Sequence, residues 1–260
     1  ALMAEEGRDI DRDVLTSHRI DLHIHTVVSP CAEIEMIPPL IVERAVELGL
    51  DWIAITDHNT AEMVEAVQRA AATTGLKVLP GMEVQSREEV HILCLFDSLA
   101  QALQWQAIVY DSLPAEKNRS EVFGAQYVVN HTGDYLREND RLLLTSTTMS
   151  TETIVSRVRE MGGLPLAAHV DRPTFSLLAN LGFVPEGLAL AGLEISRWQT
   201  VEGFRKEHPH LAQWPLIGSS DAHQLSDMRP RTQAKMAGRK IGELELALRG
   251  ELGRGLVVED

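Results

Sequence analysis

The chain has 260 residues, of which 44% are hydrophobic and 24% are charged. These fractions resemble those of an average globular protein, so they exclude wholesale disorder, collagen-like repeats and a long coiled coil. The 24 basic and 38 acidic residues give a net charge of −14, which argues against a surface built to bind long nucleic acid. Because no stretch approaches the ~20 apolar residues of a membrane span and residues 1–17 do not resemble a signal peptide, we expect a cytoplasmic protein with no membrane partner.

Predicted strands and helices alternate along the first hundred residues. Residues 19–26 alternate apolar and polar side chains, as a half-buried strand does. Pro38 and Pro39 stand where prolines are tolerated at the start of a helix, and Gly49 supplies its end. Together the patterns predict strands over 19–26, 52–56, 76–79 and 90–96 and helices over 38–48 and 61–72. Such alternation is typical of a parallel α/β architecture.

The alternation stops between Asp97 and Gly163, where the chain carries one weak strand pattern over 141–145. Connections in compact α/β domains usually hold ~2–6 residues, so we interpret about 98–150 as a mostly helical insertion that elaborates the domain or covers its mouth. Beyond it, the sequence predicts strands over 164–169, 188–195 and 216–219 and a helix over 243–248. A single α/β barrel accommodates this length, so we expect one domain over residues 1–260.

Six of the ten histidines stand within or directly after predicted strands: His23, His25, His58, His91, His169 and His223. Histidines at positions i and i+2 of a strand point the same way, so His23 and His25 can bind one ion together. An α/β barrel assembles its active site at the carboxyl ends of several strands. Imidazole and carboxylate ligands suit zinc, iron and manganese, and carboxylates stand nearby at Asp21, Asp57, Glu83 and Asp221. The sequence therefore predicts a site for divalent metal.

The remaining histidines and the two cysteines are interpreted differently. Four histidines lack this placement and are not expected to bind metal: His18, His131, His208 and His210. Cys31 and Cys94 each lie near potential metal ligands, so we expect reduced thiols rather than a disulfide. Cys94 lies inside a predicted strand, and we interpret it as a small core residue.

Six separated motifs carry a family resemblance. They are Asp21–Thr26 (DLHIHT), Ile55–Asn59 (ITDHN), Gly81–Val84 (GMEV), His91, Ala168-His169 and Ser220–His223 (SDAH). This ordered set covers nearly the whole chain and resembles that of the PHP (polymerase and histidinol phosphatase) superfamily. The resemblance implies a distorted (β/α)7 TIM-like barrel with two or three divalent metal ions (zinc, manganese or iron) at one end. It also implies hydrolysis of a phosphoester.

The resemblance implies a ligand set for each metal. One metal would be bound by His23, His25, Glu83 and Asp221. Glu83 would bridge to a second metal, bound also by His91 and His169, and a third would use His58 and His223. Superfamily members often complete the third site with a histidine or aspartate, whereas this chain has Ser29-Pro30-Cys31 at that place. A Cys31 thiolate would be a good ligand for zinc, and the alternative is a spectator thiol.

Phosphoester hydrolysis also needs groups that act on the substrate. Two metal ions ~3.5–4 Å apart polarise the phosphoryl oxygens and stabilise the attacking and departing oxygens. Asp57 or His223 could orient the water or protonate the leaving group. A planar guanidinium suits phosphate, and Arg172 and Arg197 both follow predicted strands, with a surface salt bridge as the alternative for each. Arg172 is therefore a candidate for both binding and catalysis, and Arg229 and Arg231 are weaker candidates.

These patterns predict a metal-dependent phosphoesterase that acts on a small phosphorylated substrate or a nucleotide. One alternative is a short-oligonucleotide exonuclease of the same superfamily, which needs only a pocket for a terminal nucleotide. The others are an amidohydrolase-like enzyme that cleaves C–N bonds and a non-catalytic metal-binding accessory domain. The candidate arginines favour phosphate, and the ligand-competent motif positions argue against an accessory domain.

Overall fold

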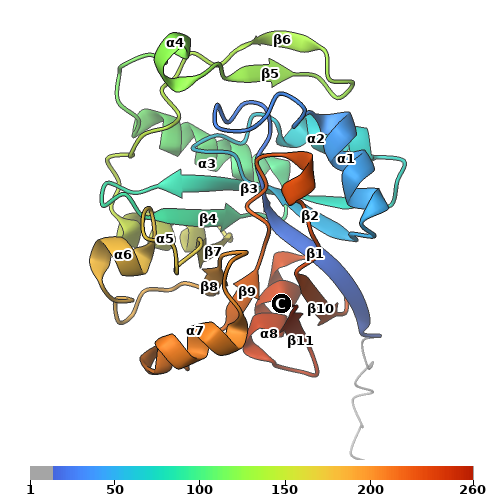
Figure 1. Cartoon of the computed structure of the whole chain (residues 1–260), viewed down its shortest axis with the longest axis vertical. Helices are drawn as coiled ribbons and strands as arrows, with labels where there is room; N and C mark the ends of the chain where they lie inside the picture. The colour runs from blue at the N-terminus through green and yellow to red at the C-terminus, as the bar shows by residue number, and fades with distance from the viewer. Residues whose placement is uncertain (1–13, 260) are drawn as a thin grey trace, which may run out of the picture.

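The computed structural model describes residues 14–259, and a nine-stranded sheet that curves into a nearly closed barrel lies at its centre (Figure 1). Neighbouring strands follow the order β11-β10-β1-β2-β3-β4-β7-β8-β9. Their bounds are β1 Thr16–Ile24, β2 Trp52–Ile55, β3 Lys77–Gln85, β4 His91–Leu95, β7 Leu164–Ala167, β8 Gly192–Ile195, β9 Leu216–Gly218, β10 Thr232–Met236 and β11 Gly255–Val258.

The strands do not all run in one direction. β1, β2 and β3 are parallel to one another, and so are β7, β8 and β9. β4 runs antiparallel to both β3 and β7, so its first residue lies beside the carboxyl ends of its neighbours. The antiparallel strands β10 and β11 extend the sheet beyond β1. Leaving these two aside, seven strands form the wall of the barrel.

The barrel closes where the segment after β9 meets β1. Ala222 and Ile24 form a parallel bridge, in which the Ala222 N–H donates to the His23 carbonyl at 3.1 Å and the His25 N–H donates to the Ala222 carbonyl at 3.0 Å. β9 also approaches β11, because a Cβ on Gly218 would lie 2.7 Å from Val258 Cγ1. The closure places the first and last motifs of the sequence side by side.

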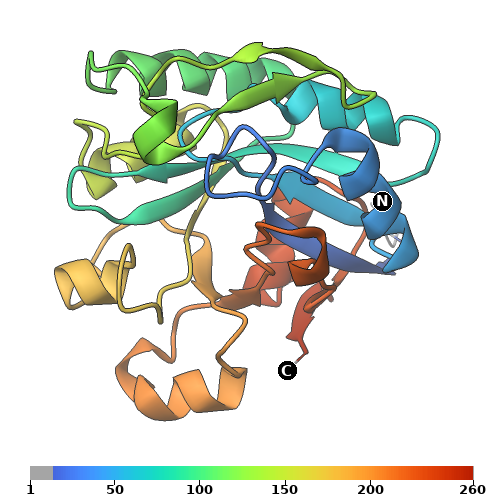
Figure 2. The same ribbon diagram turned by 45° about the horizontal axis from the view of Figure 1, so that its top comes forward.

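Helices cover the outside of the sheet and one of its ends. Figures 1 and 2 show α1, α2 and α3 on one side of the sheet, with α7 projecting at the opposite end of the molecule. Among residues 14–259, no helix is long and apolar enough to cross a membrane. The helices are α1 Pro38–Glu47, α2 Val64–Ala71, α3 Leu99–Asp111, α4 Ser120–Phe123, α5 Thr151–Glu160, α6 Leu177–Leu181, α7 Val201–Glu207 and α8 Ile241–Arg249, with the short 3-10 helices η1 Pro209–Leu211 and η2 Leu225–Asp227.

Alternating side chains in the strands build two hydrophobic clusters. In β2, Trp52 and Ala54 join a cluster that draws on most strands and on α8, so this cluster fills the interior of the barrel. Ile53 and Ile55 point the other way and join a cluster with residues of α1, α2 and α3. Because α8 supplies apolar side chains to the interior cluster, it closes one end of the barrel and leaves the other end for polar residues.

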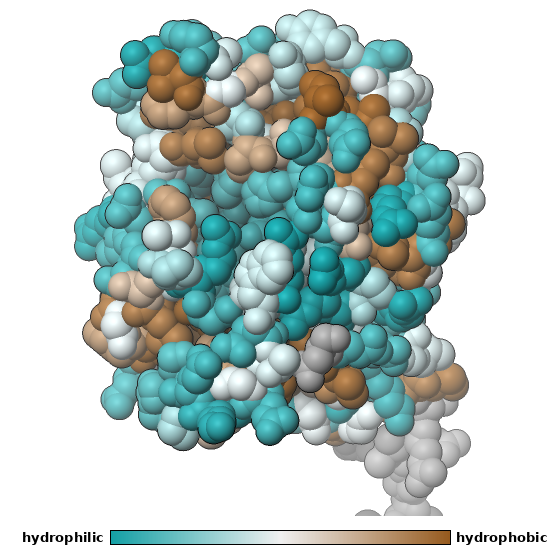
Figure 3. Space-filling model, viewed as in Figure 1, coloured by the Kyte–Doolittle hydropathy of each residue, from teal (hydrophilic) through white to brown (hydrophobic). Residues whose placement is uncertain are grey.

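The insertion adds a separate layer. Residues 98–150 form α3, α4 and a two-stranded hairpin of β5 (Tyr127–Val129) and β6 (Tyr135–Glu138). The hairpin lies at the top of Figure 1, where Figure 3 shows apolar patches, whereas the middle of the same face is hydrophilic. Val128 packs with Val27 and Leu143 in a small cluster apart from the two main ones.

The structure confirms the barrel fold class and most of the predicted elements. Seven predicted strands correspond to β1, β2, β3, β4, β7, β8 and β9, and the predicted helices correspond to α1, α2 and α8. The strand predicted over 141–145 is wrong, since beyond an isolated bridge at Arg141 these residues pair with no strand. The apolar pattern that suggested a strand arises because the Leu143 side chain is fully buried in the small cluster. The sequence analysis did not anticipate β5, β6, β10 and β11 or the helices α5, α6 and α7, whereas α3 and α4 lie in the segment that it predicted to be mostly helical.

Candidate metal centre

The open end of the barrel gathers the predicted ligands from six segments of the chain. β1 provides His23, and His25 follows it directly. The loop after β2 provides His58, and β3 provides Glu83. His91 is the first residue of the reversed strand β4. The loops after β7 and β9 provide His169, Asp221 and His223.

The end of β1 is irregular, and this irregularity turns His23 into the barrel mouth. The pairing of β1 with β2 changes register between Asp21 and Ile24, as a β-bulge does. Leu22 joins the interior cluster whereas Ile24 joins the outer one, although regular alternation would place both on the same face. Within this bend, His23 Nε2 lies 3.1 Å from His25 Nε2, so the two rings converge as the sequence predicts.

Glu83 lies at the centre of the cluster with only 1% of its surface exposed. Ring nitrogens of five histidines surround its two oxygens. The distances to Oε1 are 2.8 Å from His91 Nδ1, 3.0 Å from His169 Nε2 and 3.4 Å from His23 Nε2, and those to Oε2 are 3.2 Å from His58 Nδ1 and 3.3 Å from His25 Nε2. A carboxylate whose oxygens face two different sets of imidazoles has the geometry of a bridging ligand.

Asp221 faces the same cluster from the last barrel loop. Its Oδ1 lies 3.2 Å from His23 Nε2 and 3.3 Å from His25 Nε2. The backbone of Asp221 has φ +50°, a left-handed conformation that asparagine and aspartate adopt more readily than other side-chain-bearing residues. Strained positions of this kind gather at functional sites.

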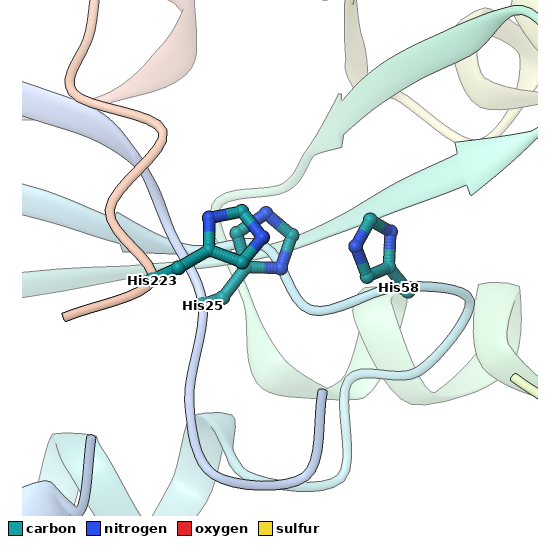
Figure 4. Close-up of side chains that lie close together, drawn as sticks. All are labelled: His25, His58 and His223. Atoms are coloured by element: carbon teal, nitrogen blue, oxygen red, sulfur yellow. The ribbon is translucent and has the colours of Figure 1, made fainter. Parts of the chain in front are cut away.

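Three groups of side chains bring their ligand atoms within 4.8 Å of one another: His23 with His25 and Asp221, His25 with His58 and His223, and His58 with Glu83 and His91. Figure 4 shows the second group, with the rings of His25 and His223 overlapping and His58 facing them. The stacked rings have centroids 4.2 Å apart. The predicted ligands, His169 included through Glu83, therefore form one continuous cluster.

Burial and charge divide the histidines into two classes. Burial lowers the pKa of His58 and His91, and it lowers the pKa of His223 to about 4, helped by the neighbouring charge of His25. Burial alone would lower the pKa of His25 as well, but contacts with Asp221 and Glu83 raise it to about 9. The charges of Glu194, Asp221 and Glu83 likewise outweigh burial and hold the pKa of His23 well above its usual value. The neutral histidines have a lone pair for a metal, whereas His23 and His25 each carry a proton that a metal would displace.

The unpaired atoms of the cluster fit divalent metal. Among the described residues, the buried atoms Glu83 Oε2 and His169 Nδ1 have no hydrogen-bond partner. Ring nitrogens lie 3.2–3.3 Å from Glu83 Oε2 without forming a hydrogen bond to it, and such convergence of ligand atoms on one space is the arrangement that a cation compensates. The donor set of imidazoles and carboxylates is typical of zinc, manganese and iron sites.

A second carboxylate, which the sequence analysis did not select, supports the ligands from behind. Glu194 in β8 is 1% exposed, and its Oε1 lies 2.9 Å from His23 Nδ1 and accepts the His169 backbone N–H at 3.0 Å. Such outer carboxylates fix the ring orientation of metal-binding histidines. The signal available in the sequence was a charged residue inside the apolar run Leu193-Glu194-Ile195.

Asp57, a predicted catalytic residue, is fully buried behind the cluster. Its Oδ1 accepts hydrogen bonds from Thr26 N at 2.6 Å and Ser29 Oγ at 2.7 Å, and its Oδ2 accepts one from Thr26 Oγ1 at 2.8 Å. Ser29 Oγ in turn lies 3.2 Å from His25 Nδ1. With both oxygens engaged, the carboxylate is placed to orient the His25 loop rather than to reach a substrate.

Cys31 lies at the rim. It is exposed and lines the cavity over the cluster. It belongs to none of the three ligand groups found among the described residues, and His25 stands with His58 and His223 where the sequence analysis placed the thiol. Desolvation and the charge of Glu83 raise the pKa of the Cys31 thiol to about 12. Cys94 is buried in the outer hydrophobic cluster, as expected of a core residue.

A cavity of about 480 Å³ opens onto the cluster. Arg172 lies on its wall and donates a hydrogen bond to Asp221 Oδ2 at 3.0 Å, with 39% of its side chain exposed. Arg197 lies outside this cavity, in an adjoining one of about 250 Å³ that Arg172 also lines. Phe175 covers part of the wall, with its ring stacked on His91; the sequence analysis did not identify it.

The other candidate residues lie elsewhere or are already engaged. Arg231 is buried and donates to the backbone of the loop after β8, and Arg229 donates to the carbonyl of Asp227. His208 and His210 lie beside each other at the end of α7, away from the ligand groups. His18 contacts Thr16 near the start of β1, and His131 lies in the turn between β5 and β6.

Comparison with known proteins places this cluster in a family. Residues 21–161 match the PHP domain family. Over 80 residues the chain is 35% identical to the 5'-3' exoribonuclease Rnm of Salmonella typhimurium, a stretch that covers 29% of this chain and 26% of Rnm.

Two solved structures share the fold. Endonuclease Q of Pyrococcus furiosus has a TM-score of 0.66 and 18% identity, over 93% of this chain and 58% of that protein. A candidate metal-dependent phosphoesterase of Bifidobacterium adolescentis has a TM-score of 0.55 and 21% identity, over 78% of this chain and 87% of that protein. The chain thus spans about a quarter of Rnm and over half of endonuclease Q. Because the family match extends over more than half of the sequence and includes the histidines and carboxylates at the amino-terminal part of the barrel mouth, this chain belongs to the PHP domain family.

Proposed function

We propose that this protein is a metal-dependent phosphoesterase that cleaves a phosphoester of a nucleotide or of a nucleic-acid end. One observation carries the proposal: the buried carboxylate of Glu83 is surrounded by five imidazoles at 2.8–3.4 Å. Packing of a hydrophobic core does not require a buried carboxylate surrounded by imidazoles, whereas a metal centre with a bridging ligand does.

The residues would divide the work as follows. Glu83, Asp221 and the histidines around them would hold two or three divalent ions, His58 and His223 serving the outermost with His25. Bound ions would polarise the phosphoryl oxygens and lower the pKa of an attacking water. Arg172, at the border of the cavity, would give up its hydrogen bond to Asp221 and donate to a phosphate oxygen instead. His223 is neutral at pH 7 because burial lowers its pKa to about 4, so its lone pair would bind an ion and it would not serve as a proton donor.

The sequence predicts a small phosphorylated substrate or a nucleotide, and the names of the relatives add support for phosphodiester substrates. Rnm is named as an exoribonuclease, and endonuclease Q has been solved with a 27-mer DNA duplex. The net charge of −14 argues against long contacts along a strand. A terminal nucleotide at the cavity satisfies both observations, so the exonuclease alternative gains support over a phosphatase for small sugars.

The test is an activity screen of protein reconstituted with manganese, zinc or iron. Substrates would be phosphomonoesters, nucleoside bisphosphates and short oligonucleotides, with an amide substrate as the C–N alternative. We expect turnover of the nucleotide or oligonucleotide class. No phosphoester hydrolysis at full metal occupancy would contradict the proposal, and turnover of the amide alone would favour the amidohydrolase-like alternative.

Glu83→Gln provides the matched variant. Because the amide carries no negative charge to hold two cations, we expect its metal content to fall and kcat/KM to fall at least a hundredfold, as measured by elemental analysis and steady-state kinetics. His210→Asn, at an exposed histidine outside the cluster, should leave both unchanged. A Glu83→Gln protein that keeps its metals and a tenth of the turnover would remove Glu83 from the mechanism.

A further inference from the structure

One large aromatic side chain beside the metal cavity has no role in packing. Trp198 follows β8 and is 81% exposed, although tryptophan is normally among the more buried residues of a protein. It lines the adjoining cavity of about 250 Å³, which shares Arg172, Asp221 and His223 with the cavity over the metal ligands. The indole therefore stands at the edge of the same binding region.

The loop that carries Trp198 is held firmly against the metal centre. The Ser196 N–H donates to Asp171 Oδ1 at 2.6 Å, and the Ser196 hydroxyl bonds the other oxygen of Asp171. Asp171 lies between the predicted ligand His169 and Arg172 in the loop after β7. The position of Trp198 relative to the phosphate-binding candidate Arg172 is thus fixed by direct hydrogen bonds.

A buried arginine fixes the same loop from its other side. Arg231 Nη1 donates to the Ser196 carbonyl at 2.7 Å, and its Nη2 donates to the Gln199 carbonyl at 2.9 Å. These bonds bracket Trp198 in the sequence. Because hydrogen bonds hold this loop on both sides of Trp198, the exposure of the indole is not explained by a loose loop. The exposed indole is available to a ligand.

The chemistry around the indole selects a flat aromatic group. The Arg197 guanidinium lies 4.8 Å from the Trp198 ring centroid and is itself bound to Asp227 Oδ1 at 2.6 Å. An indole backed by a fixed cation is a stacking platform of the kind that binds bases in single strands. The adjoining cavity is smaller than the usual ligand pocket, so it suits one planar ring rather than a whole nucleotide.

We propose that Trp198 stacks on a nucleobase of the substrate while the phosphate lies at Arg172 and the metal ligands. This inference rests on the proposed phosphoesterase function and narrows its substrate class to nucleotides and unpaired nucleic-acid ends. Sugar phosphates and other phosphomonoesters without a base would miss the contact. A base that stacks on Trp198 has left its own stack, so a paired duplex interior would also miss it.

Direct binding tests the proposal without turnover. A 5′-phosphorylated deoxyadenosine trinucleotide and a matched trinucleotide with three abasic sites, both carrying phosphorothioates at the 5′ end and in the linkages to resist cleavage, are titrated by calorimetry into the full metal-loaded chain. We expect the base-bearing probe to bind about tenfold more tightly, as stacking of one base predicts. Trp198→Ala should bring the two affinities within twofold, and Trp198→Phe should keep most of the difference. Phe183→Ala, which removes another exposed aromatic ring, should keep all of it.

Intrinsic fluorescence gives a second measurement on the unmodified protein. Trp52 and Trp105 are fully buried and Trp214 is partly buried, so the part of the iodide quenching that Trp198→Ala removes reports on Trp198. The base-bearing probe should reduce that part while the abasic probe does not. Equal affinity for the two probes in the wild-type chain, an unchanged ratio in Trp198→Ala, or no protection from iodide would each overturn the inference. Hydrolysis with no base preference in binding would refute this site alone, whereas base-dependent binding without hydrolysis would refute the phosphoesterase alone.

Discussion

At the scale of single residues, the orientation of a histidine ring matters as much as its position. His23 Nδ1 lies 2.9 Å from Glu194 Oε1, so Nε2 is the nitrogen that faces Glu83 and Asp221. The same carboxylate accepts the backbone N–H of His169, whose φ of +28° is rare for a residue with a side chain. One buried glutamate thereby positions two candidate ligands.

Glu194→Gln should therefore weaken metal binding without removing a ligand. The amide can no longer bind the ring N–H of His23 with a full negative charge, and losses at such outer positions are typically about 10- to 100-fold in metal affinity. Competition with a fluorescent chelator measures the change. Glu202→Gln, an exposed carboxylate in α7, is the control. Equal metal affinity in the Glu194 variant and wild type would show that Glu194 serves packing only.

Cys31 yields a second prediction at this scale. Since its thiol stands outside the three ligand groups and His25 completes the set with His58 and His223, we expect Cys31→Ser to retain its full metal content. Cobalt-loaded wild type should then lack a sulfur-to-metal charge-transfer band in the near ultraviolet. A band that vanishes in Cys31→Ser and persists in Cys94→Ser would instead establish the thiolate ligand that the sequence suggests.

At the scale of elements, one side chain beside the metal centre makes two hydrogen bonds to the insertion. Asn59 follows His58 and has φ +51°. Its Nδ2 donates to the carbonyls of Leu143 and Thr145 at 2.9 Å each, and its Oδ1 accepts the Gln85 N–H at 3.1 Å. The segment after the hairpin, the loop after β2 and the end of β3 therefore share one hydrogen-bonded residue.

Asn59→Gly should loosen the contact between these elements while sparing the backbone, because glycine adopts positive φ freely. Losing three side-chain hydrogen bonds should lower the free energy of unfolding by about 2–4 kcal/mol, as measured by urea denaturation. Because His58 loses its support, metal affinity should fall too. Unchanged unfolding and metal binding would mean that other contacts, such as the hydrogen bonds of Gln85 with Ser146 and Thr147, hold the insertion without Asn59.

At the scale of the whole molecule, the predicted ligands connect strands that are far apart in the sequence. Glu83 in β3 and Asp221 after β9 both contact His23 in β1, and the barrel closes between Ile24 and Ala222. Ions bound here would link strands that are distant in sequence at the point where the sheet closes. Metal binding would therefore be coupled to the stability of the barrel.

Removal of metal tests this coupling. EDTA should lower the Tm, and manganese should restore it, by an amount corresponding to about 2.7 kcal/mol at a hundredfold excess over Kd. In the metal-free protein, contacts with carboxylates raise the pKa of His25 to about 9, so its charge stabilises the fold fully below about 6.5 and that contribution is lost as pH rises through about 9. Metal must displace this proton, so the Tm difference should be larger at pH 8 than at pH 6. A difference that shrinks with rising pH would contradict the assignment.

Much of the site can be predicted from the sequence because histidines and carboxylates are unusual within and directly after apolar strands. Histidines at i and i+2 of a strand, and histidines and carboxylates directly after apolar runs, predict metal ligands at one end of an α/β barrel. Those positions are His23, His25, His58, Glu83, His91, His169, Asp221 and His223, and all of them lie in one cluster. Local patterns are enough to predict that these side chains gather at one end, whereas the turn of His23 into the barrel mouth also needs the irregular end of β1.

Features that depend on which strands and loops lie side by side could be determined from the tertiary structure alone. The reversal of β4, which brings its first residue His91 to the site, has no local signal, since an apolar run reads the same in either direction. The support given by Glu194 arises from contact between residues 171 positions apart, and the burial of Asp57 depends on the bend after β1. The position of Trp198 beside Arg172 likewise depends on the fold, which brings the loops after β7 and β8 together. Local patterns fix residue direction along a strand, whereas the partners across a barrel are chosen by the packing of the whole chain.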